Sequence, residues 1–135
     1  MFFDSSAIVA RLLKKDAKHK EAVNLFEEMV KRELPYSEFY TSNYVIDEVV
    51  TFILYEQGHG EAVKALEILR GSPFLNILHV SEEVEAGADK EFKKYAGHRI
   101  SYTDCTTRVL MDIHEIDTVF SFDMDFEIMG MHRIP

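Results

Sequence analysis

Four acidic residues far apart in the chain have the chemistry of one metal site: Asp4, Glu48, Asp104 and Asp123. Each follows an apolar segment typical of a strand or lies in the first turns of an expected helix. Two carboxylates a few ångströms apart repel, and at least one stays protonated near neutral pH unless a cation lies between them. Mg²⁺ and Mn²⁺ prefer hard oxygen ligands and remove that repulsion. Together the four acids predict a divalent-cation site that activates water for attack on phosphorus.

Three of these acids also have an ordinary structural explanation. Asp4 follows the apolar residues 1–3 and is a good N-cap for a helix. Asp104 lies three residues after Ser101, which is the pattern of a capping box. Asp123 follows a predicted strand and is suited to cap a turn or a short helix. Taken one at a time, each is explained at least as well by capping as by chemistry.

Glu48 is harder to explain by local structure. It lies within residues 44–54, a predicted helix that is apolar on nearly every side and is therefore expected to be central and buried. An ionised carboxylate buried without a partner costs several kcal/mol or becomes protonated. Glu48 therefore needs a nearby cation or a route to solvent, whereas Asp47 beside it is expected to face water.

The length of 135 residues predicts a single domain, residues 1–135. The hydrophobic fraction of 47% and mean hydropathy of −0.13 are typical of a soluble globular protein. Because no apolar stretch reaches the ~20 residues of a membrane span and no signal peptide is recognisable, a cytoplasmic protein without a membrane segment is expected. The single cysteine, Cys105, excludes an internal disulfide and is expected to be a packing residue.

The formal net charge of −9 argues against binding of nucleic acid through the overall field of the protein. It does not exclude a nuclease whose acids lie in a cleft and are neutralised by divalent cations. Two local basic segments are present, within residues 14–20 and residues 93–99. Each is interpreted first as a solvated helix end.

The hydrophobic pattern predicts strands that alternate with helices. The expected strands are residues 1–3, 37–40, 75–80, 118–122 and a short edge strand at 131–134. The expected helices are residues 5–15, 19–33, 44–57, 61–69, 82–95 and 102–115. This alternation predicts βαβ units and a mostly parallel sheet, in which ligands gather at the carboxyl ends of the strands. The four acids are therefore expected to meet at that edge.

The segments around these acids resemble a PIN domain, the metal-dependent ribonuclease fold used by VapC-type toxins. The likeness extends over essentially the whole chain. It rests on the segments MFFDSSAIVA, SNYVIDEVV, RISYTDC and TVFSFDMDFEIMGMHRIP. The last is the most specific, because many members end with Ser or Thr, one further residue, and then Asp-x-Asp-Phe.

This resemblance implies an α/β/α sandwich with a central, mostly parallel sheet. It also implies that four acids hold one or two Mg²⁺ or Mn²⁺ ions or activate the water. The matching positions here are Asp4, Glu48, Asp104 and Asp123. Ser121 corresponds to the hydroxyl residue beside the site, and Ser5 to the Ser or Thr after the first acid. Asp125 corresponds to an additional acid that belongs to the metal site in some members.

The predicted function is hydrolysis of RNA phosphodiesters by a metal-activated water, in the toxin of a VapBC-type toxin–antitoxin pair. The predicted partners are RNA, an antitoxin protein and a second copy in a homodimer. Apolar stripes within residues 5–33 are suited to either protein interface, and packing within the chain explains them equally well. Two alternatives stay open: a non-catalytic RNA- or protein-binding module on the PIN scaffold, and a housekeeping RNA-processing enzyme, DNA nuclease or phosphatase with the same carboxylates.

Overall fold

The computed structural model describes all 135 residues and contains a five-stranded sheet in which every neighbouring pair of strands is parallel. Its strands are β1 (Phe2–Phe3), β2 (Phe39–Ser42), β3 (Leu75–Leu78), β4 (Thr118–Phe120) and β5 (His132–Ile134). Their order across the sheet is β3-β2-β1-β4-β5, so the first strand is central. Phe2 pairs with Tyr40 on one side and with Val119 on the other. The predicted parallel sheet is confirmed.

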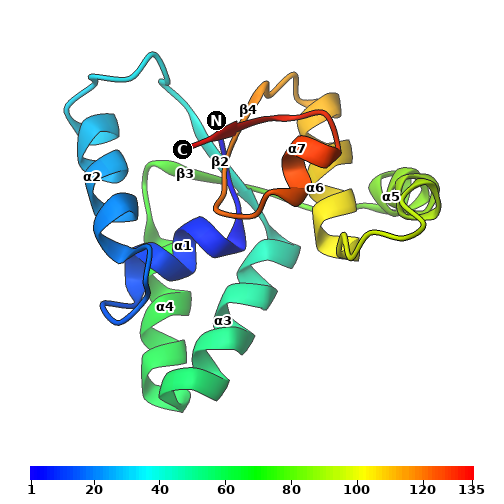
Figure 1. Cartoon of the computed structure of the whole chain (residues 1–135). Coiled ribbons are helices and arrows are strands. Elements are labelled where there is room, and N and C mark those ends of the chain that lie inside the picture. Colours follow the sequence, from blue (N-terminus) through cyan, green and yellow to red (C-terminus); the bar gives the residue numbers. More distant parts are fainter.

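Seven helices connect the strands. They are α1 (Ser5–Leu12), α2 (His19–Val30), α3 (Asn43–Gln57), α4 (His59–Gly71), α5 (Glu82–Lys94), α6 (Tyr102–Ile113) and α7 (Asp125–Ile128). Figure 1 shows α1 and α2 on one side of the sheet and α5, α6 and α7 on the other, which confirms the α/β/α sandwich. The hairpin of α3 and α4 extends below the sheet in this view. None of the helices has the length and hydropathy needed to cross a membrane.

The end of β4 differs from the sequence prediction in a way that affects the site. The strand stops at Phe120 instead of residue 122, so Asp123 lies in a loop. The cause is a change of hydrogen-bond partner after Ser121. Its backbone nitrogen still donates to Ile134, but the nitrogen of Phe122 donates to the side chain of Ser6, at 2.9 Å. The short helix α7, which follows this loop, is not part of the predicted set of helices.

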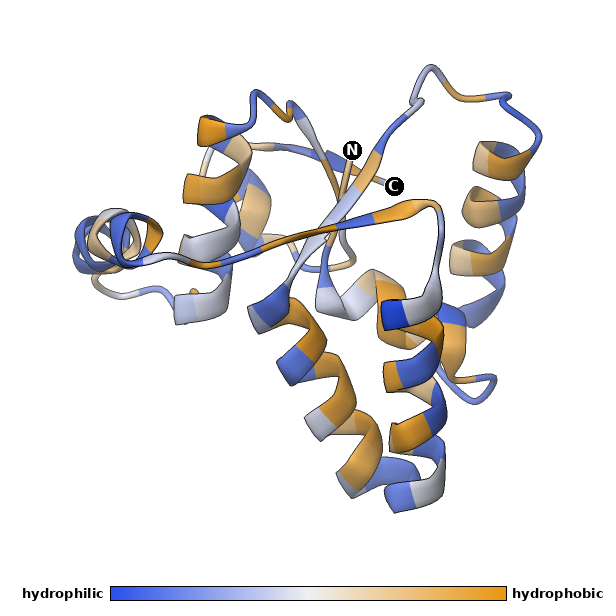
Figure 2. Ribbon diagram, turned by 180° about the vertical axis from the view of Figure 1, so that it is seen from behind, coloured by the Kyte–Doolittle hydropathy of each residue, from blue (hydrophilic) through white to orange (hydrophobic).

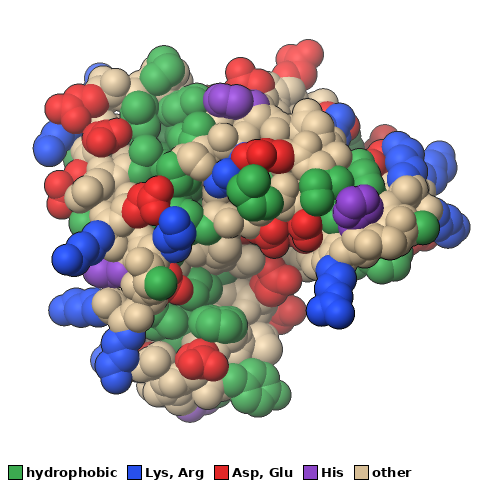
Figure 3. Space-filling model, viewed as in Figure 1, with side chains coloured by type: hydrophobic (Ala, Val, Ile, Leu, Met, Phe, Trp, Pro, Cys, Tyr) green, Lys and Arg blue, Asp and Glu red, His purple; other side chains and the backbone are tan.

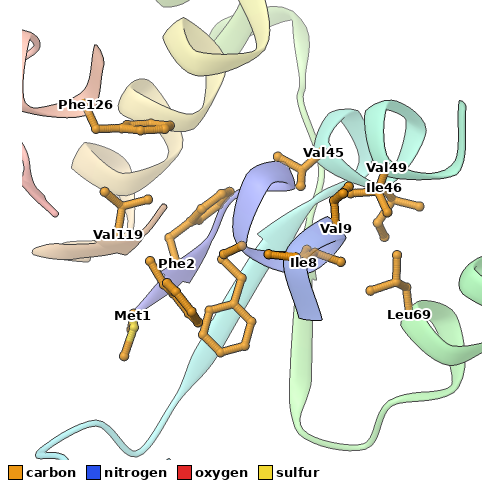
Figure 4. Packing of buried hydrophobic residues seen from close by; sticks show 14 of the residues in the cluster. Met1, Phe2, Ile8, Val9, Val45, Ile46, Val49, Leu69, Val119 and Phe126 are labelled. Atoms are coloured by element: carbon orange, nitrogen blue, oxygen red, sulfur yellow. The ribbon is translucent and has the colours of Figure 1, made fainter. Parts of the chain in front are cut away.

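The main core holds the elements that carry the acids in fixed relative positions. It is a cluster of 25 buried apolar residues, several of which Figure 4 labels. Phe2 comes from the central strand β1 and Val119 from its neighbour β4, while Val9 of α1 lies beside Ile46 and Val49 of α3 (Figure 4). Burial of each such side chain contributes roughly 1.5–3 kcal/mol. Because α1 starts after Asp4 and α3 contains Glu48, this packing sets the distance between the two acids.

The prediction of a central, buried α3 is right for its first half and for one side of its second half. Val45, Val49 and Ile53 are buried, but Phe52 and Tyr55 are 45% and 83% exposed. The reason is that the α3–α4 hairpin leaves the sheet, so each helix has one main packing partner along its far half. Figure 2 shows hydrophobic bands along both helices of this hairpin.

Candidate metal centre

Asp104 is held in the first turn of α6 by the predicted capping box. The hydroxyl of Ser101 accepts a hydrogen bond from the backbone nitrogen of Asp104 at 3.0 Å. In return, Oδ2 of Asp104 accepts from the backbone nitrogen of Ser101 at 2.9 Å and from its hydroxyl at 2.7 Å. Capping and chemistry are compatible here, because these bonds use only Oδ2 and leave Oδ1 without a hydrogen-bond donor.

Asp4 caps α1 as predicted and is also oriented through one oxygen. Its Oδ2 accepts from the backbone nitrogen of Ser6 at 3.1 Å, from the Ser6 hydroxyl at 2.7 Å and from the Ser121 hydroxyl at 2.8 Å. Its Oδ1 has only a longer contact of 3.4 Å from the Ser5 hydroxyl. Asp4 is 2% exposed, so these donors stabilise a carboxylate that water barely reaches.

Ser6 and Ser121 connect the first acid to the loop that carries the fourth. Their hydroxyl oxygens are 3.0 Å apart. Ser121 Oγ accepts from the backbone nitrogen of Asp123 at 3.0 Å, in addition to the bond from Phe122 to Ser6 described above. The sequence prediction named Ser5 and missed Ser6. A signal was available, because an N-cap carboxylate accepts from the second or third helical residue, and Ser6 is the second.

Arg133 holds the same loop from β5. Its guanidinium donates to the backbone oxygen of Ser121 at 3.0 Å and forms an ion pair with Glu127 of α7 at 2.7 Å. The Arg133 side chain is only 12% exposed, so this pair is better shielded than a surface salt bridge. Sequence reasoning missed this residue because its partners are assembled by the tertiary fold.

The closest group of acids comprises Asp104, Asp123 and Asp125, each of which offers an oxygen within 4.8 Å of the other two. Asp104 is buried, Asp125 is half-buried and Asp123 is exposed. Asp4 and Glu48 are not members of this triplet. Both lie near enough that their negative charges raise the pKa of Asp104. Figure 3 shows Asp and Glu side chains gathered in the middle of this face, over the starts of α3 and α6.

Burial dominates the electrostatics of the site. It raises the pKa of Asp104 to about 7, with a contribution from Asp4 and Glu48 that the hydrogen bonds from Ser101 oppose. Burial also raises the pKa of Glu48, and the nearby charges of Asp4 and Asp123 add to the effect. The pKa of Asp4 is raised by burial despite its hydrogen bonds from Ser6 and Ser121. Repulsion and burial therefore favour a bound cation or a bound proton.

The donor set fits Mg²⁺ or Mn²⁺. All candidate ligands are carboxylate oxygens, which these cations prefer over nitrogen and sulfur. Cys105 follows Asp104 but is fully buried, and burial raises the pKa of its thiol to about 11, so it is no thiolate ligand.

Comparison with known proteins identifies relatives over most of the chain. A family model for the PIN domain matches residues 1–130. The 23S rRNA-specific endonuclease VapC20 of Mycobacterium tuberculosis is 30% identical over 94 residues, which are 70% of this chain and 71% of the relative. The crystal structure of M. tuberculosis VapC20, described as a sarcin-ricin loop cleaving toxin, matches with a TM-score of 0.86 at 28% identity, over 96% of this chain and 95% of that one. FitAcB from Neisseria gonorrhoeae shares the fold, with a TM-score of 0.71 at 18% identity over 99% and 96% of the two chains.

Proposed function

Since this chain belongs to the PIN domain family, we propose that it is an endoribonuclease dependent on Mg²⁺ or Mn²⁺ and the toxin of a VapBC-type toxin–antitoxin pair. The family membership confirms the resemblance carried by the acidic segments. The observation that carries the metal-dependent chemistry is the triplet of carboxylates within 4.8 Å, beside Asp4 and Glu48. The name of VapC20 supports RNA as the substrate. We also propose that the protein acts in the cytoplasm, where ribosomal RNA of the kind named for that relative is found.

In this proposal the acids divide into ligands and a proton acceptor. Asp104, Asp123 and Asp125 would hold the cation. Oδ1 of Asp4, which accepts only a 3.4 Å hydrogen bond from Ser5, would complete the set. A bound cation would supply charge neutralisation and Lewis-acid chemistry. Glu48, whose pKa is raised by burial, is suited to accept the proton of the attacking water. Water attacks phosphorus, the bond to the ribose 3′ oxygen breaks, and the products are a 3′-hydroxyl and a 5′-phosphate.

The antitoxin is proposed to dock in an apolar groove of about 850 Å³. The groove runs between α2 and α4 and is lined by Phe26 and Val30 of α2 and by Phe74 before β3. Val30 and Phe74 are 83% and 77% exposed, which is unusual for apolar side chains within one groove. Arg11 and Arg32 lie in the same lining and form no ion pair. These features fit an amphipathic antitoxin segment with acidic side chains.

Capture of a co-expressed antitoxin tests this groove. Val30→Glu, which places a charge of the wrong sign for an acidic segment, is expected to abolish co-purification. Ile113→Glu, at a half-exposed position on α6, is the matched control and should retain it. Equal capture by both variants would place the antitoxin elsewhere.

The homodimer is proposed to form through the far half of the α3–α4 hairpin. This region exposes Phe52, Leu54 and Tyr55 of α3, whereas the predicted stripes within residues 5–33 contribute to the core and the groove. Tyr55→Glu is expected to convert a dimer to a monomer in size-exclusion chromatography with light scattering. A parent protein that is monomeric at all concentrations would refute this part of the proposal.

The catalytic proposal is tested on purified protein with total RNA and with DNA of matched length. We expect cleavage of RNA in Mg²⁺ or Mn²⁺, none in EDTA, and 5′-phosphate ends on the products. Asp104→Asn should abolish cleavage while the circular dichroism spectrum stays unchanged. Cleavage of DNA alone would favour the DNA nuclease alternative, and metal-dependent binding without cleavage would favour the non-catalytic module.

A further inference from the structure

The end of α5 and the loop into α6 form a surface with no role in the metal centre. We call it the α5 shelf and define it by Lys90, Phe92, Lys93, Arg99 and Tyr102. The three cations are exposed and take part in no ion pair or side-chain hydrogen bond, and the Phe92 ring is 52% exposed. Figure 3 shows Lys and Arg side chains over α5, to the right of the acidic gathering. Lys90 and Lys93, three residues apart, share one face of α5, whereas the Phe92 ring lies on another face, toward Tyr102 of α6. The shelf is thus a cationic helix face beside an accessible aromatic ring.

One contact and one anchored loop connect the shelf to the metal centre. The Phe92 ring packs edge-to-face on Tyr102, with ring centroids 6.0 Å apart. Tyr102 is the first residue of α6 and lies two residues before Asp104. On the loop, Arg99 is followed by Ile100, which is 5% exposed and anchors the chain before the α6 cap. The shelf therefore begins at the rim of the acidic site.

Local structure does not account for the whole shelf. The helix dipole explains why α5 ends in Lys93 and Lys94, and Lys94 pairs with Glu91. Neither effect explains Lys90 in the helix, the exposed ring of Phe92, or Arg99 beyond the helix. The nearby acid Asp89 accepts a hydrogen bond from the hydroxyl of Tyr102 at 3.0 Å.

The other basic segment has a different environment. Lys14 and Lys15 line a small pocket together with Glu56 and Glu61 at the α3–α4 turn. That turn is the far end of α3 from Glu48, about 13 Å along the helix at 1.5 Å per residue. These lysines therefore share their pocket with acids and lie away from the metal centre.

We infer that the α5 shelf binds a single-stranded stretch of RNA next to the phosphate that is cut. This inference rests on the proposed ribonuclease function and adds the surface that positions the substrate. Lysine and arginine neutralise backbone phosphates, and an exposed aromatic ring stacks on an unpaired base. On a chain with a net charge of −9, the shelf supplies the local positive field that the overall charge lacks. Stacking on Phe92 requires an unpaired base, so the shelf selects single strands over duplex.

The test measures binding of a fluorescein-labelled single-stranded oligoribonucleotide by anisotropy, at several salt concentrations. All proteins carry Asp104→Asn so that the RNA stays intact. Lys90→Gln with Lys93→Gln is expected to weaken binding about ten-fold at low salt. It should also reduce the slope of log K against log salt by about 1.4, which corresponds to two lost phosphate contacts. Lys14→Gln with Lys15→Gln removes the same charge and should leave affinity and slope unchanged.

The aromatic part of the shelf has its own variants. Phe92→Ala is expected to weaken binding roughly ten-fold with no change in the salt slope, because stacking releases no counterions. Phe92→Tyr keeps a ring and should restore the affinity. The melting temperature of each variant is measured to show that weaker binding is not caused by unfolding. The lysine variants change only exposed positions and therefore test the shelf independently.

The inference would be overturned if the Lys90 and Lys93 variant bound RNA with unchanged affinity, or if the Lys14 and Lys15 control lost as much affinity. It would also be overturned if the shelf variants weakened binding of duplex RNA as much as binding of single strands. Loss of antitoxin binding with RNA binding intact would also overturn it. Failure of the proposed ribonuclease function would give a different result from failure of the shelf proposal. RNA binding that depends on the shelf, in a parent protein that cleaves no RNA, would refute the ribonuclease and keep the shelf.

Discussion

The hydroxyl of Ser6 donates to Oδ2 of Asp4 at 2.7 Å and, through the same oxygen, accepts from the loop that leads to Asp123. One side chain therefore orients the first acid and holds the fourth near it. Groups that orient a metal ligand in this way commonly change metal affinity 10–100-fold when they are removed. Ser6 is accordingly a positioning residue for the proposed metal site.

Ser6→Ala is expected to weaken Mn²⁺ binding about ten-fold, measured by calorimetry, because Asp4 and the Phe122 nitrogen both lose a partner. The free energy of unfolding should fall by about 1–3 kcal/mol, the usual effect of leaving a buried polar group unsatisfied. Ser6→Thr keeps the hydroxyl and should restore most of both. Ser5→Ala is the comparison variant and should have a smaller effect, because it removes a 3.4 Å contact with Asp4 and the hydrogen bond that lowers the pKa of Glu48, but no bond to the loop. Equal effects of the two alanine variants would contradict the assignment.

Without metal, stability is expected to fall as pH rises from about 4 to about 7. The pKa of folded Asp104 is raised from 3.8 to about 7, so the protonated acid favours the folded state. This contribution is fully present below pH 4, is lost as the pH passes 7, and amounts to about 4 kcal/mol at most. Urea unfolding in EDTA at several pH values measures it. Asp104→Asn should reduce the slope and leave the part that comes from Asp4 and Glu48, whose pKa values burial also raises, and Asp112→Asn on the same helix should not reduce it.

Mn²⁺ is expected to raise the melting temperature. At about 100 times the dissociation constant, a ligand stabilises by about 2.7 kcal/mol, which is on the order of 10 °C for a chain of this size. The rise should be larger at pH 8 than at pH 6, because Asp104 must lose its proton to bind a cation. Asp125→Asn should reduce it, whereas Glu67→Gln on α4 should not. An undiminished rise in Asp125→Asn would exclude Asp125 as a ligand.

Arg133→Lys is expected to weaken Mn²⁺ binding although the charge is kept. A lysine cannot reproduce the fork that joins Ser121 and Glu127, so the loop with Asp123 and Asp125 loses its support from β5. Calorimetric titration beside Lys31→Arg, an exchange at an exposed ion pair of α2, separates this loss from a general effect of substitution. Parent-like affinity in Arg133→Lys would show that α1 alone positions the loop.

The predictions from sequence succeeded where a feature depends on residues near one another in the chain. The cap at Asp4 and the capping box at Ser101 and Asp104 need only a short segment with the right side chains. The parallel sheet follows from the alternation of strand and helix patterns. The exposure of Phe52 and Tyr55 was not predictable in this way, because an apolar helix has the same pattern whether or not a neighbour covers it.

By itself, then, the sequence determined the order of the elements, their caps, and the edge of the sheet at which the acids would meet. Only the tertiary structure decided that Asp125 lies within 4.8 Å of Asp104 and Asp123, that Ser6 bonds Asp4 more closely than Ser5 does, and that Arg133 supports the loop from β5. The physical reason is the separation along the chain between the residues that interact. Hydrogen bonds within one turn are encoded locally, whereas distances between side chains separated by about a hundred residues depend on how α1, α6 and the loop after β4 pack around a common core.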